Sequence, residues 1–172
     1  MRVVIFDLDG TLADTFPDIA AAVNVALSGR GLPAQSLESI SKMVGAGIGE
    51  LCRRAAPVLG ESELPAFVEE VRRAYQATPV RDSRAYSGVL VALRELRARG
   101  YSCAVLSNKP HALTVLVCEH LGFAPYLDAV VGEDAPHTPP KPDPTGGRRV
   151  MEQLGAHEIG RASCRERVYV LV

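Results

Sequence analysis

A short apolar run near the start of the chain ends abruptly in a polar turn, and this feature most constrains the fold. Residues 2–6, with the sequence RVVIF, are rich in β-branched side chains, and the polar run DLDGT follows at once at 7–11. A run of this length and composition predicts a buried parallel strand. The polar turn then lies at the carboxyl end of the strand, which is where open parallel sheets bind their ligands.

Helical and strand patterns occupy different parts of the chain. No convincing strand is seen between Asp14 and about Val80, and apolar residues there recur at helical spacing in three stretches, 16–27, 48–55 and 64–75. Predicted strands and helices then alternate, in the order 89–96, 101–106, 113–121, 129–131 and 150–154. The proline-rich segment 133–144 is predicted to be a loop. Gly146 and Gly147 are expected to delay the last helix, since an interior glycine costs about 1 kcal/mol relative to alanine.

Alternating strands and helices predict an α/β fold with a mainly parallel sheet and helices on both faces. The all-helical stretch after the first strand predicts a second, smaller module inserted into the sheet domain. With 172 residues and 47% hydrophobic residues, the chain is able to bury a substantial core.

Two of the predicted strands end in polar clusters that would meet at one edge of the sheet. Asp7 and Asp9 follow the first strand, and Ser107 and Asn108 follow the strand at 101–106. Two carboxylates in an i, i+2 pair can divide the chemistry, one attacking as a nucleophile and the other, with a pKa raised by its neighbour, moving protons. We expect Asp7 to attack and Asp9 to carry the proton.

The same cluster offers groups suited to phosphate oxygens. Gly10 permits close approach of the backbone, Thr11 and Ser107 carry hydroxyls, and exposed N–H groups of the turn would donate to an anion. Lys141, held between prolines, would supply the positive charge that a phosphate and an aspartate in one pocket require. The residues therefore favour phosphoryl transfer.

Three segments carry a specific family resemblance. FDLDGTL at 6–12 resembles motif one of the haloacid dehalogenase superfamily, SNKP at 107–110 resembles motif two, and KPDP at 141–144 resembles motif three. The motif spacing and the helical insertion are most similar to the phosphoglycolate phosphatase branch, as are two short phrases, VGAG at 44–47 and YSGV at 86–89. The resemblance covers residues 1 to about 157.

The resemblance implies a Rossmann-like core at 1–13 and 82–157, with a helical cap at 14–81. It also implies a Mg²⁺ ion and hydrolysis of a small phosphate monoester through an aspartyl-phosphate. Carried over by residue, Asp7 is the nucleophile and a metal ligand, and Asp9 is the general acid/base and a metal ligand through its backbone carbonyl. Ser107 and Lys141 would bind the transferring phosphoryl group with Asn108 adjacent, in a pocket shared with Gly10 and Thr11.

The family's fourth motif, an acidic pair after a further strand, has no counterpart in this sequence. Residues 159–168 resemble the in-frame translation of a sequencing-library adapter, so we expect 158–172 to be a non-native tail. Residues 168–172 have the β-branched composition to occupy the position beside the first strand, which would otherwise be an unpaired edge. Because Asp7 and Asp9 alone give Mg²⁺ few protein ligands, the chain is expected to be weakly active or inactive.

Several functions remain open on the sequence. A Mg²⁺-dependent phosphatase acting on a small phosphorylated metabolite is favoured. The alternatives are an inactive truncated fragment and a non-enzymatic phosphate-binding module. A phosphonatase or dehalogenase on the same scaffold is a further alternative, although the sequence at 107–109 argues against both.

Net charge, apolar runs and cysteine content indicate the kind of partner, the compartment and the state of the thiols. Nineteen basic and twenty acidic residues leave a net charge of −1, which argues against nucleic-acid and acidic-membrane partners. Short apolar runs and the lack of a signal-peptide core predict a cytoplasmic protein. Four cysteines without a C-x-x-C pair predict reduced thiols rather than disulfides or a zinc site. The sequence is silent on oligomeric state.

Overall fold

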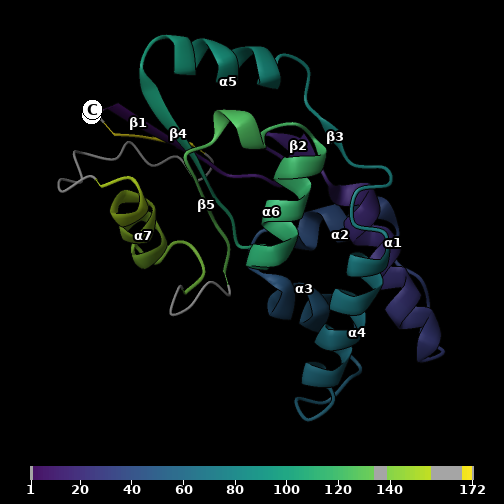
Figure 1. Ribbon diagram of the computed structural model, residues 1–172. Helices are drawn as coiled ribbons and strands as arrows, with labels where there is room; N and C mark the ends of the chain where they lie inside the picture. The colour runs from purple at the N-terminus through teal and green to yellow at the C-terminus, as the bar shows by residue number, and fades with distance from the viewer. Residues whose placement is uncertain (1, 134–138, 156–167, 172) are drawn as a thin grey trace. The chain divides into compact units, whose positions relative to one another are not determined.

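The first predicted strand, β1 (Arg2–Phe6), lies inside a four-stranded sheet with the order β5-β4-β1-β6 (Figure 1). The structure is a computed structural model that describes residues 2–133, 139–155 and 168–171, called here the described residues. β4 (Tyr101–Leu106) and β5 (Ala129–Val131) run parallel to β1, and Phe6 lies opposite Val105. The predicted parallel α/β sheet is therefore confirmed.

The chain divides into two compact units. One, the sheet unit, comprises Met1–Asp14 and Arg84–Val172, and the other, the helical unit, comprises Thr15–Ser83. These limits lie close to the predicted boundaries of 14–81 for the inserted module. That the helical unit acts as a cap remains a prediction.

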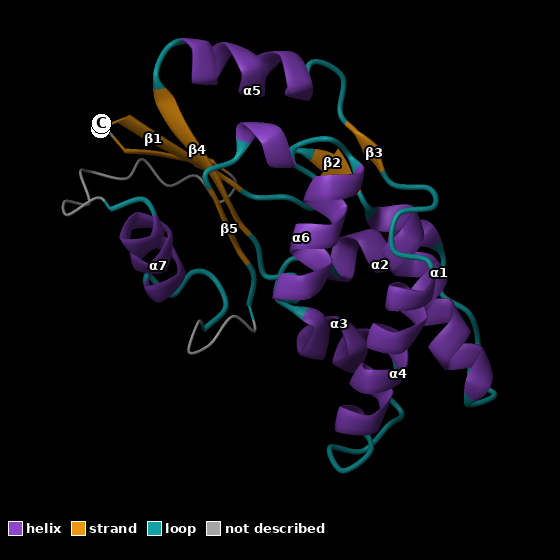
Figure 2. Ribbon diagram, in the orientation of Figure 1, coloured by secondary structure: helices purple, strands orange, loops and turns teal. Residues whose placement is uncertain are grey.

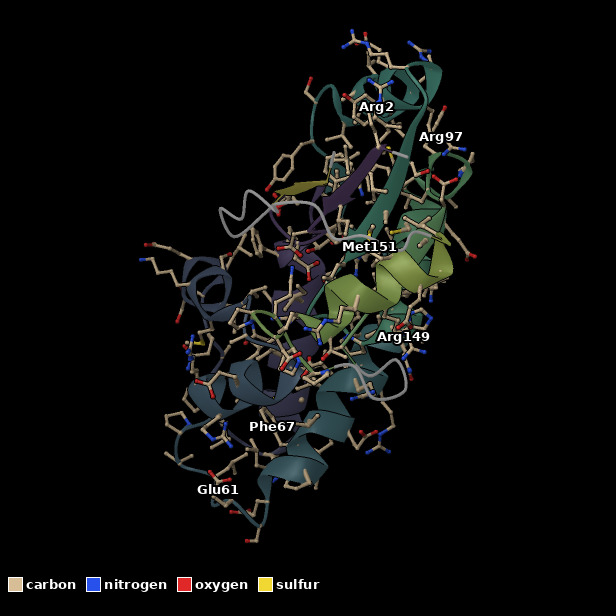
Figure 3. The ribbon with its side chains drawn as sticks, turned by 90° about the vertical axis from the view of Figure 1, so that its left-hand side faces the viewer. Arg2, Glu61, Phe67, Arg97, Arg149 and Met151 are labelled. Carbon is tan, nitrogen blue, oxygen red and sulfur yellow. The ribbon has the colours of Figure 1, made fainter. Side chains whose placement is uncertain are left out.

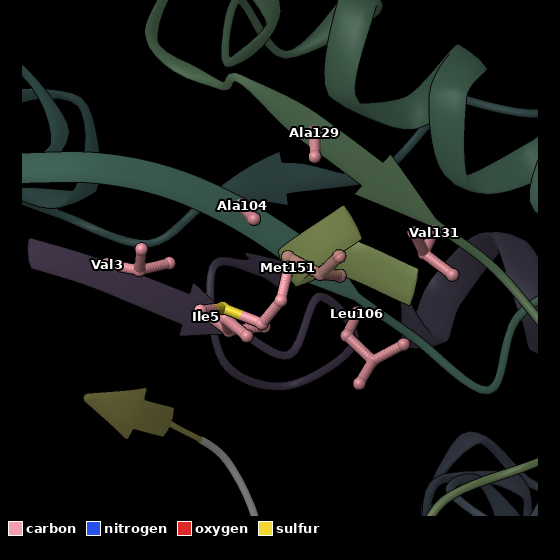
Figure 4. Packing of buried hydrophobic residues seen from close by; sticks show 8 residues of the cluster. Val3, Ile5, Ala104, Leu106, Ala129, Val131 and Met151 are labelled. Atoms are coloured by element: carbon pink, nitrogen blue, oxygen red, sulfur yellow. The ribbon is translucent and has the colours of Figure 1, made fainter. Parts of the chain in front are cut away.

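Both faces of the sheet are buried, as the continuous apolar runs of β1 and β4 predict. One face packs against α7 (Thr145–Gln153), from which Val150 and Met151 join a core with alternate residues of the strands: Val3, Ile5, Ala104, Leu106, Ala129 and Val131. Figure 4 shows the Met151 side chain reaching toward Ile5. The residues between them, such as Val4 and Val105, are also buried and belong to the opposite face.

The helices of the sheet unit follow the predicted alternation. They are α5 (Val89–Ala98), α6 (His111–His120) and α7, with a 3₁₀ turn, η1 (Ala124–Tyr126), before β5. α6 and α7 both contact β5 and lie on opposite sides of it (Figure 2). The expected late start of α7 is wrong, because the helix begins at Thr145 and holds both glycines in its first turn. The first turn is not the interior of the helix, because its backbone N–H groups have no intrahelical acceptor, so the cost of an interior glycine does not apply there. Gly146 is also buried.

The helical unit contains α1 (Phe16–Gly29), α2 (Leu37–Met43), α3 (Ile48–Ala55) and α4 (Leu64–Ala77). Phe67, labelled on α4 in Figure 3, is fully buried. The sequence analysis did not predict α2, which is only seven residues long and buries only Ile40, although Leu37, Ile40 and Met43 recur at a spacing of three residues. A second signal is the cap, where the Ser36 hydroxyl accepts a hydrogen bond from the Ser39 N–H.

The chain leaves and re-enters the sheet unit through a short antiparallel pair. β2 (Ala13–Asp14) pairs with β3 (Arg84–Ala85). Within the helical unit, the buried Asp18 carboxylate accepts hydrogen bonds from the backbone N–H groups of Asp82 and Ser83, at 2.9 and 2.7 Å. The start of α1 is therefore tied to the end of the same unit.

The position beside β1 that the sequence assigned to residues 168–172 is taken by β6 (Val168–Leu171), which runs antiparallel to β1. Residues 156–167 and 172 lie outside the described residues, so the origin of the 158–172 tail stays a prediction. Within 2–133, 139–155 and 168–171, no helix is both long and apolar enough to span a bilayer.

Three of the four cysteines behave as predicted. Cys52, Cys103 and Cys118 are free and buried. Burial raises the pKa of the Cys52 and Cys118 thiols to about 12, so they stay protonated near neutral pH. Cys164 lies outside the described residues.

Candidate active site

The turn after β1 places Asp7 and Asp9 at the carboxyl end of the strand. It is held by the carbonyl of the fully buried Leu8, which accepts hydrogen bonds from the N–H groups of Thr11, Leu12 and Ala13 at 3.0–3.2 Å. Gly10 has φ of +73°, a conformation that residues with a Cβ rarely adopt.

The turn satisfies two of its own backbone amides. The Gly10 N–H donates to the Ala13 carbonyl at 2.8 Å, and the Thr11 N–H donates to Leu8. These two N–H groups are therefore already satisfied, because the tight turn folds back on its own carbonyls. Gly10 contributes its backbone conformation to the site.

Lys141 reaches the first aspartate from the loop before α7. Its Nζ lies 2.8 Å from Asp7 Oδ1 and 2.9 Å from the Leu106 carbonyl oxygen. Asp7 Oδ1 also accepts a hydrogen bond from the Leu8 N–H at 2.8 Å. Burial raises the pKa of the Asp7 carboxyl above its ordinary value, Lys141 and the Leu8 N–H lower it, and the charge of Asp9 raises it further.

Asn108 fixes the main chain of Lys141. Its Oδ1 accepts a hydrogen bond from the Lys141 N–H at 2.6 Å, and its Nδ2 donates to the Lys141 carbonyl at 3.2 Å. Both polar ends of the amide thus hold the lysine loop, whereas the sequence placed Asn108 among the phosphate-binding residues. The Asn108 side chain therefore positions the main chain of Lys141.

Replacing Asn108 with alanine should therefore slow turnover without removing it. We expect kcat/KM to fall about 10- to 100-fold, since a loop displacement near 1 Å costs on this scale. Steady-state kinetics on a phosphate monoester measure the loss. Asn24→Ala is the control, because Asn24 makes a similar two-way contact with the Gln35 main chain inside the helical unit. Equal losses in both variants would contradict the assigned role.

Two hydroxyl groups lie in the same part of the sheet unit. Thr11 Oγ1 is buried and finds no hydrogen-bond partner among the described residues. Ser107 is 2% exposed, its N–H donates to the Val131 carbonyl, and its Oγ accepts from the Lys109 N–H at 3.2 Å. A buried hydroxyl without a partner is uncommon, so Thr11 Oγ1 is a candidate donor to an acceptor oxygen outside the described residues.

Lys109 is a site residue that the sequence reasoning missed. Its Nζ lies 3.2 Å from Asp9 Oδ1, and the two side chains are 4% and 11% exposed. The available signal was its position directly after Ser107 and Asn108. A lysine that is buried is nearly always paired with an acid.

Gly132, directly after β5, lets the loop that carries Lys109 pack closely. A Cβ at this position would lie 2.6 Å from both the His111 nitrogen and the Lys109 carbonyl oxygen, and would also overlap the His111 Cα. We expect Gly132→Ala to lower the free energy of unfolding by about 2–3 kcal/mol. Chemical denaturation measures the loss. Gly147→Ala is the control, because its Cβ would meet nothing within 4 Å and alanine favours a helix. Similar stability of both variants would contradict the close packing.

The donor set for a metal can be judged from the described residues. They contain no group of three or more His, Cys, Asp or Glu side chains arranged to hold a metal ion. Mg²⁺ often binds through one or two carboxylates, with waters and substrate phosphate completing its shell. Asp7 and Asp9 fit that kind of site, although each already contacts a lysine.

Comparison with known proteins identifies the family. The model of the haloacid dehalogenase-like hydrolases matches residues 4–160. The chain belongs to this family. The predicted resemblance to its phosphoglycolate phosphatase branch is confirmed as well, and by family the chain is a phosphoric monoester hydrolase.

Several relatives named phosphoglycolate phosphatase share a similar level of sequence identity with this chain. The protein from Aquifex aeolicus is 34% identical over 155 residues, which cover 90% of this chain and 71% of the relative. The protein from Nitrosospira multiformis is 37% identical over 150 residues, covering 84% of this chain and 66% of the relative. The chain thus spans about two thirds of the length of its curated relatives.

The fold of the family members agrees with this assignment. A crystal structure from Haemophilus somnus, described as a predicted phosphoglycolate phosphatase, matches with a TM-score of 0.80 and 28% identity, covering 90% of this chain and 71% of that one. A predicted phosphatase from Clostridium acetobutylicum matches with a TM-score of 0.76 and 26% identity, covering 90% and 70%.

Proposed function

We propose that the protein is a Mg²⁺-dependent phosphatase that hydrolyses a small phosphate monoester through an aspartyl-phosphate on Asp7. The observation that carries this proposal is the 2.8 Å contact between Asp7 Oδ1 and Lys141 Nζ at the carboxyl end of β1. The ammonium group favours the ionised, nucleophilic form of the carboxylate against the effect of burial, and the same positive charge attracts phosphate.

In the first half of the reaction, the Asp7 carboxylate attacks phosphorus. The new Asp7 oxygen–phosphorus bond forms as the ester oxygen–phosphorus bond breaks, and Asp9 gives its proton to the departing oxygen. In the second half, Asp9 takes a proton from water, which attacks phosphorus and releases phosphate and Asp7. Lys141 lies where it can offset the charge of the phosphoryl oxygens.

The hydroxyls of Thr11 and Ser107 complete the proposed phosphate site. The buried Thr11 Oγ1, which lacks a partner among the described residues, is suited to donate to a phosphoryl oxygen. Asp7 and Asp9 would hold Mg²⁺, with the Asp9 contribution coming from its backbone carbonyl. When bound, the ion offsets the repulsion between a phosphate dianion and the Asp7 carboxylate.

The relatives' name suggests phosphoglycolate as the substrate to try first. The test incubates the chain with phosphoglycolate and Mg²⁺, quenches it with acid, and reduces the protein with borohydride. An aspartyl-phosphate at Asp7 is converted to homoserine, which peptide mass spectrometry locates. Phosphate release that EDTA abolishes, together with homoserine at position 7, is the expected result. Phosphate release without labelling would contradict the covalent route.

A phosphate-binding module without turnover is the second candidate function. The lack of a three-carboxylate cluster among the described residues favours it, because weak retention of Mg²⁺ leaves the attack of Asp7 unassisted. Saturable binding of inorganic phosphate with no ester hydrolysis in millimolar Mg²⁺ would support this candidate over the phosphatase.

A further inference from the structure

We propose that Lys109 is a positioning residue, whose ammonium group holds the Asp9 carboxyl group in the orientation that delivers a proton to the departing oxygen. The inference rests on the proposed function, in which Asp9 acts as the acid. It assigns a role to a residue outside the phosphate-binding set.

The contact between the two side chains is buried and direct. Lys109 Nζ lies 3.2 Å from Asp9 Oδ1, the lysine side chain is 4% exposed, and the aspartate side chain is 11% exposed. Water therefore has little access to the pair, so its attraction is screened less than that of a surface ion pair. A contact through one named oxygen restricts rotation of the Asp9 carboxyl group.

The backbone of Lys109 is fixed on both sides, so the ammonium group starts from a defined place. Its N–H donates to Ser107 Oγ at 3.2 Å, and its carbonyl accepts from Thr114 Oγ1 at 3.2 Å and from the Glu133 N–H at 3.1 Å. The close packing of Gly132 against the Lys109 carbonyl adds a further constraint. A fixed backbone limits the positions that the Lys109 ammonium group can reach, and Asp9 lies at one of them.

The two lysines of the site contact different aspartates. Lys141 contacts Asp7 and Lys109 contacts Asp9, and the two come from loops after different strands. Lys141 is placed to act on the nucleophile and the phosphate. Lys109 is placed to act on the proton donor, and this difference predicts that the effect of its loss depends on the leaving group.

The experiment compares two phosphate esters in the whole chain with Mg²⁺ present. Phosphoglycolate releases a strongly basic alkoxide that needs a proton, whereas p-nitrophenyl phosphate releases a phenolate that departs without one. For Lys109→Met we expect kcat/KM to fall about 100-fold on phosphoglycolate and less than about 5-fold on p-nitrophenyl phosphate, since general acid catalysis supplies effects of this size. The ratio kcat/KM is compared because it reports the transfer of phosphate to Asp7, where the leaving groups differ, and not the later hydrolysis that both esters share.

Two variants control for general damage. Lys109→Arg keeps a cation and should recover part of the lost kcat/KM on phosphoglycolate. Lys42→Met removes another lysine–acid pair, the one with Glu38, from a side chain that is 73% exposed, and should leave both esters unaffected. Equal losses of kcat/KM on the two esters in Lys109→Met would overturn the inference while leaving the proposed function intact.

If the chain hydrolyses neither ester, the proposed function is contradicted. The inference is then tested by a measurement of stability, which needs no turnover. Melting temperatures are compared for Lys109→Met, Asp9→Asn and the double variant. A direct pair predicts that the double variant loses less than the sum of the two single losses. Additive losses would overturn the inference whether or not the protein is active. If Lys109→Met fails to fold, Lys109→Gln takes its place in both experiments.

Discussion

Replacing Asp7 with asparagine is expected to abolish hydrolysis of phosphate monoesters, with a loss of at least about 10⁴-fold in kcat. An amide cannot form the acyl-phosphate, and uncatalysed hydrolysis of such esters is too slow to compensate. A sensitive assay of phosphate release measures the loss. Turnover in Asp7→Asn within tenfold of the unmodified chain would contradict the nucleophilic role.

The same variant should be more stable than the unmodified chain at neutral pH. Since burial raises the folded-state pKa of Asp7, the folded state binds more protons than the unfolded state between the two pKa values, and stability falls as pH rises through that window. Asparagine removes this cost. The melting-temperature difference between Asp7→Asn and the unmodified chain should therefore grow as pH rises from about 4 to 7.

Asp143 provides a control, because its pKa is shifted in the opposite direction to that of Asp7. Hydrogen bonds from Thr145 lower the pKa of this exposed carboxyl, so its contribution to stability is present at neutral pH and is lost on acidification. Asp143→Asn should accordingly be no more stable than the unmodified chain at pH 7. A destabilised Asp7→Asn at pH 7 would show that ionised Asp7 contributes more to the fold than its burial costs.

Removal of the Lys141 ammonium group should produce the second large effect. We expect Lys141→Met to lower kcat/KM about 10³-fold, because the variant lacks a charge that both Asp7 and the phosphate require. Lys141 lowers the pKa of Asp7 against the effect of burial, so its removal raises that pKa further. The acid limb of the pH–rate profile, where activity is lost as Asp7 is protonated, should move to higher pH.

Measurement of kcat/KM from pH 4 to 8 tests this shift. Lys141→Arg keeps the positive charge and should leave the acid limb close to that of the unmodified chain, although it changes the donor geometry. An unchanged acid limb in Lys141→Met would contradict the electrostatic coupling of Lys141 to Asp7. The two lysine variants thus separate charge from shape.

The parts of the fold that were predictable carry strong periodic signals. β1 and β4 are continuous apolar runs, and α1 and α4 show clear helical stripes, because each buries a full face. α2 spans only seven residues and buries one of them, so its apolar pattern is short and weak. The orientation of β6 depends on pairing with a strand far away in the chain, which local composition does not encode.

The candidate site was predictable where a residue type directly implies a chemistry. Asp7, Asp9 and Lys141 are charged groups placed at strand ends or between prolines, and the structure brings Asp7 and Lys141 together. Asn108 and Lys109 were harder, because their partners, the Lys141 main chain and Asp9, lie on separate loops. Those contacts are set by the pairing of β1, β4 and β5 in one sheet and not by any local sequence pattern.

The Asp18 contacts and the β2–β3 pair bear on how such a chain evolves. Asp18 ties the first helix of the helical unit to Ser83 at its end, while β2 and β3 bring the two strand segments on the other side of the boundary together. An insertion whose two ends adjoin can be exchanged for another without stretching the sheet that hosts it. The helical unit could thus change without changing the site, since new insertions would leave the aspartates and lysines of the sheet unit in place.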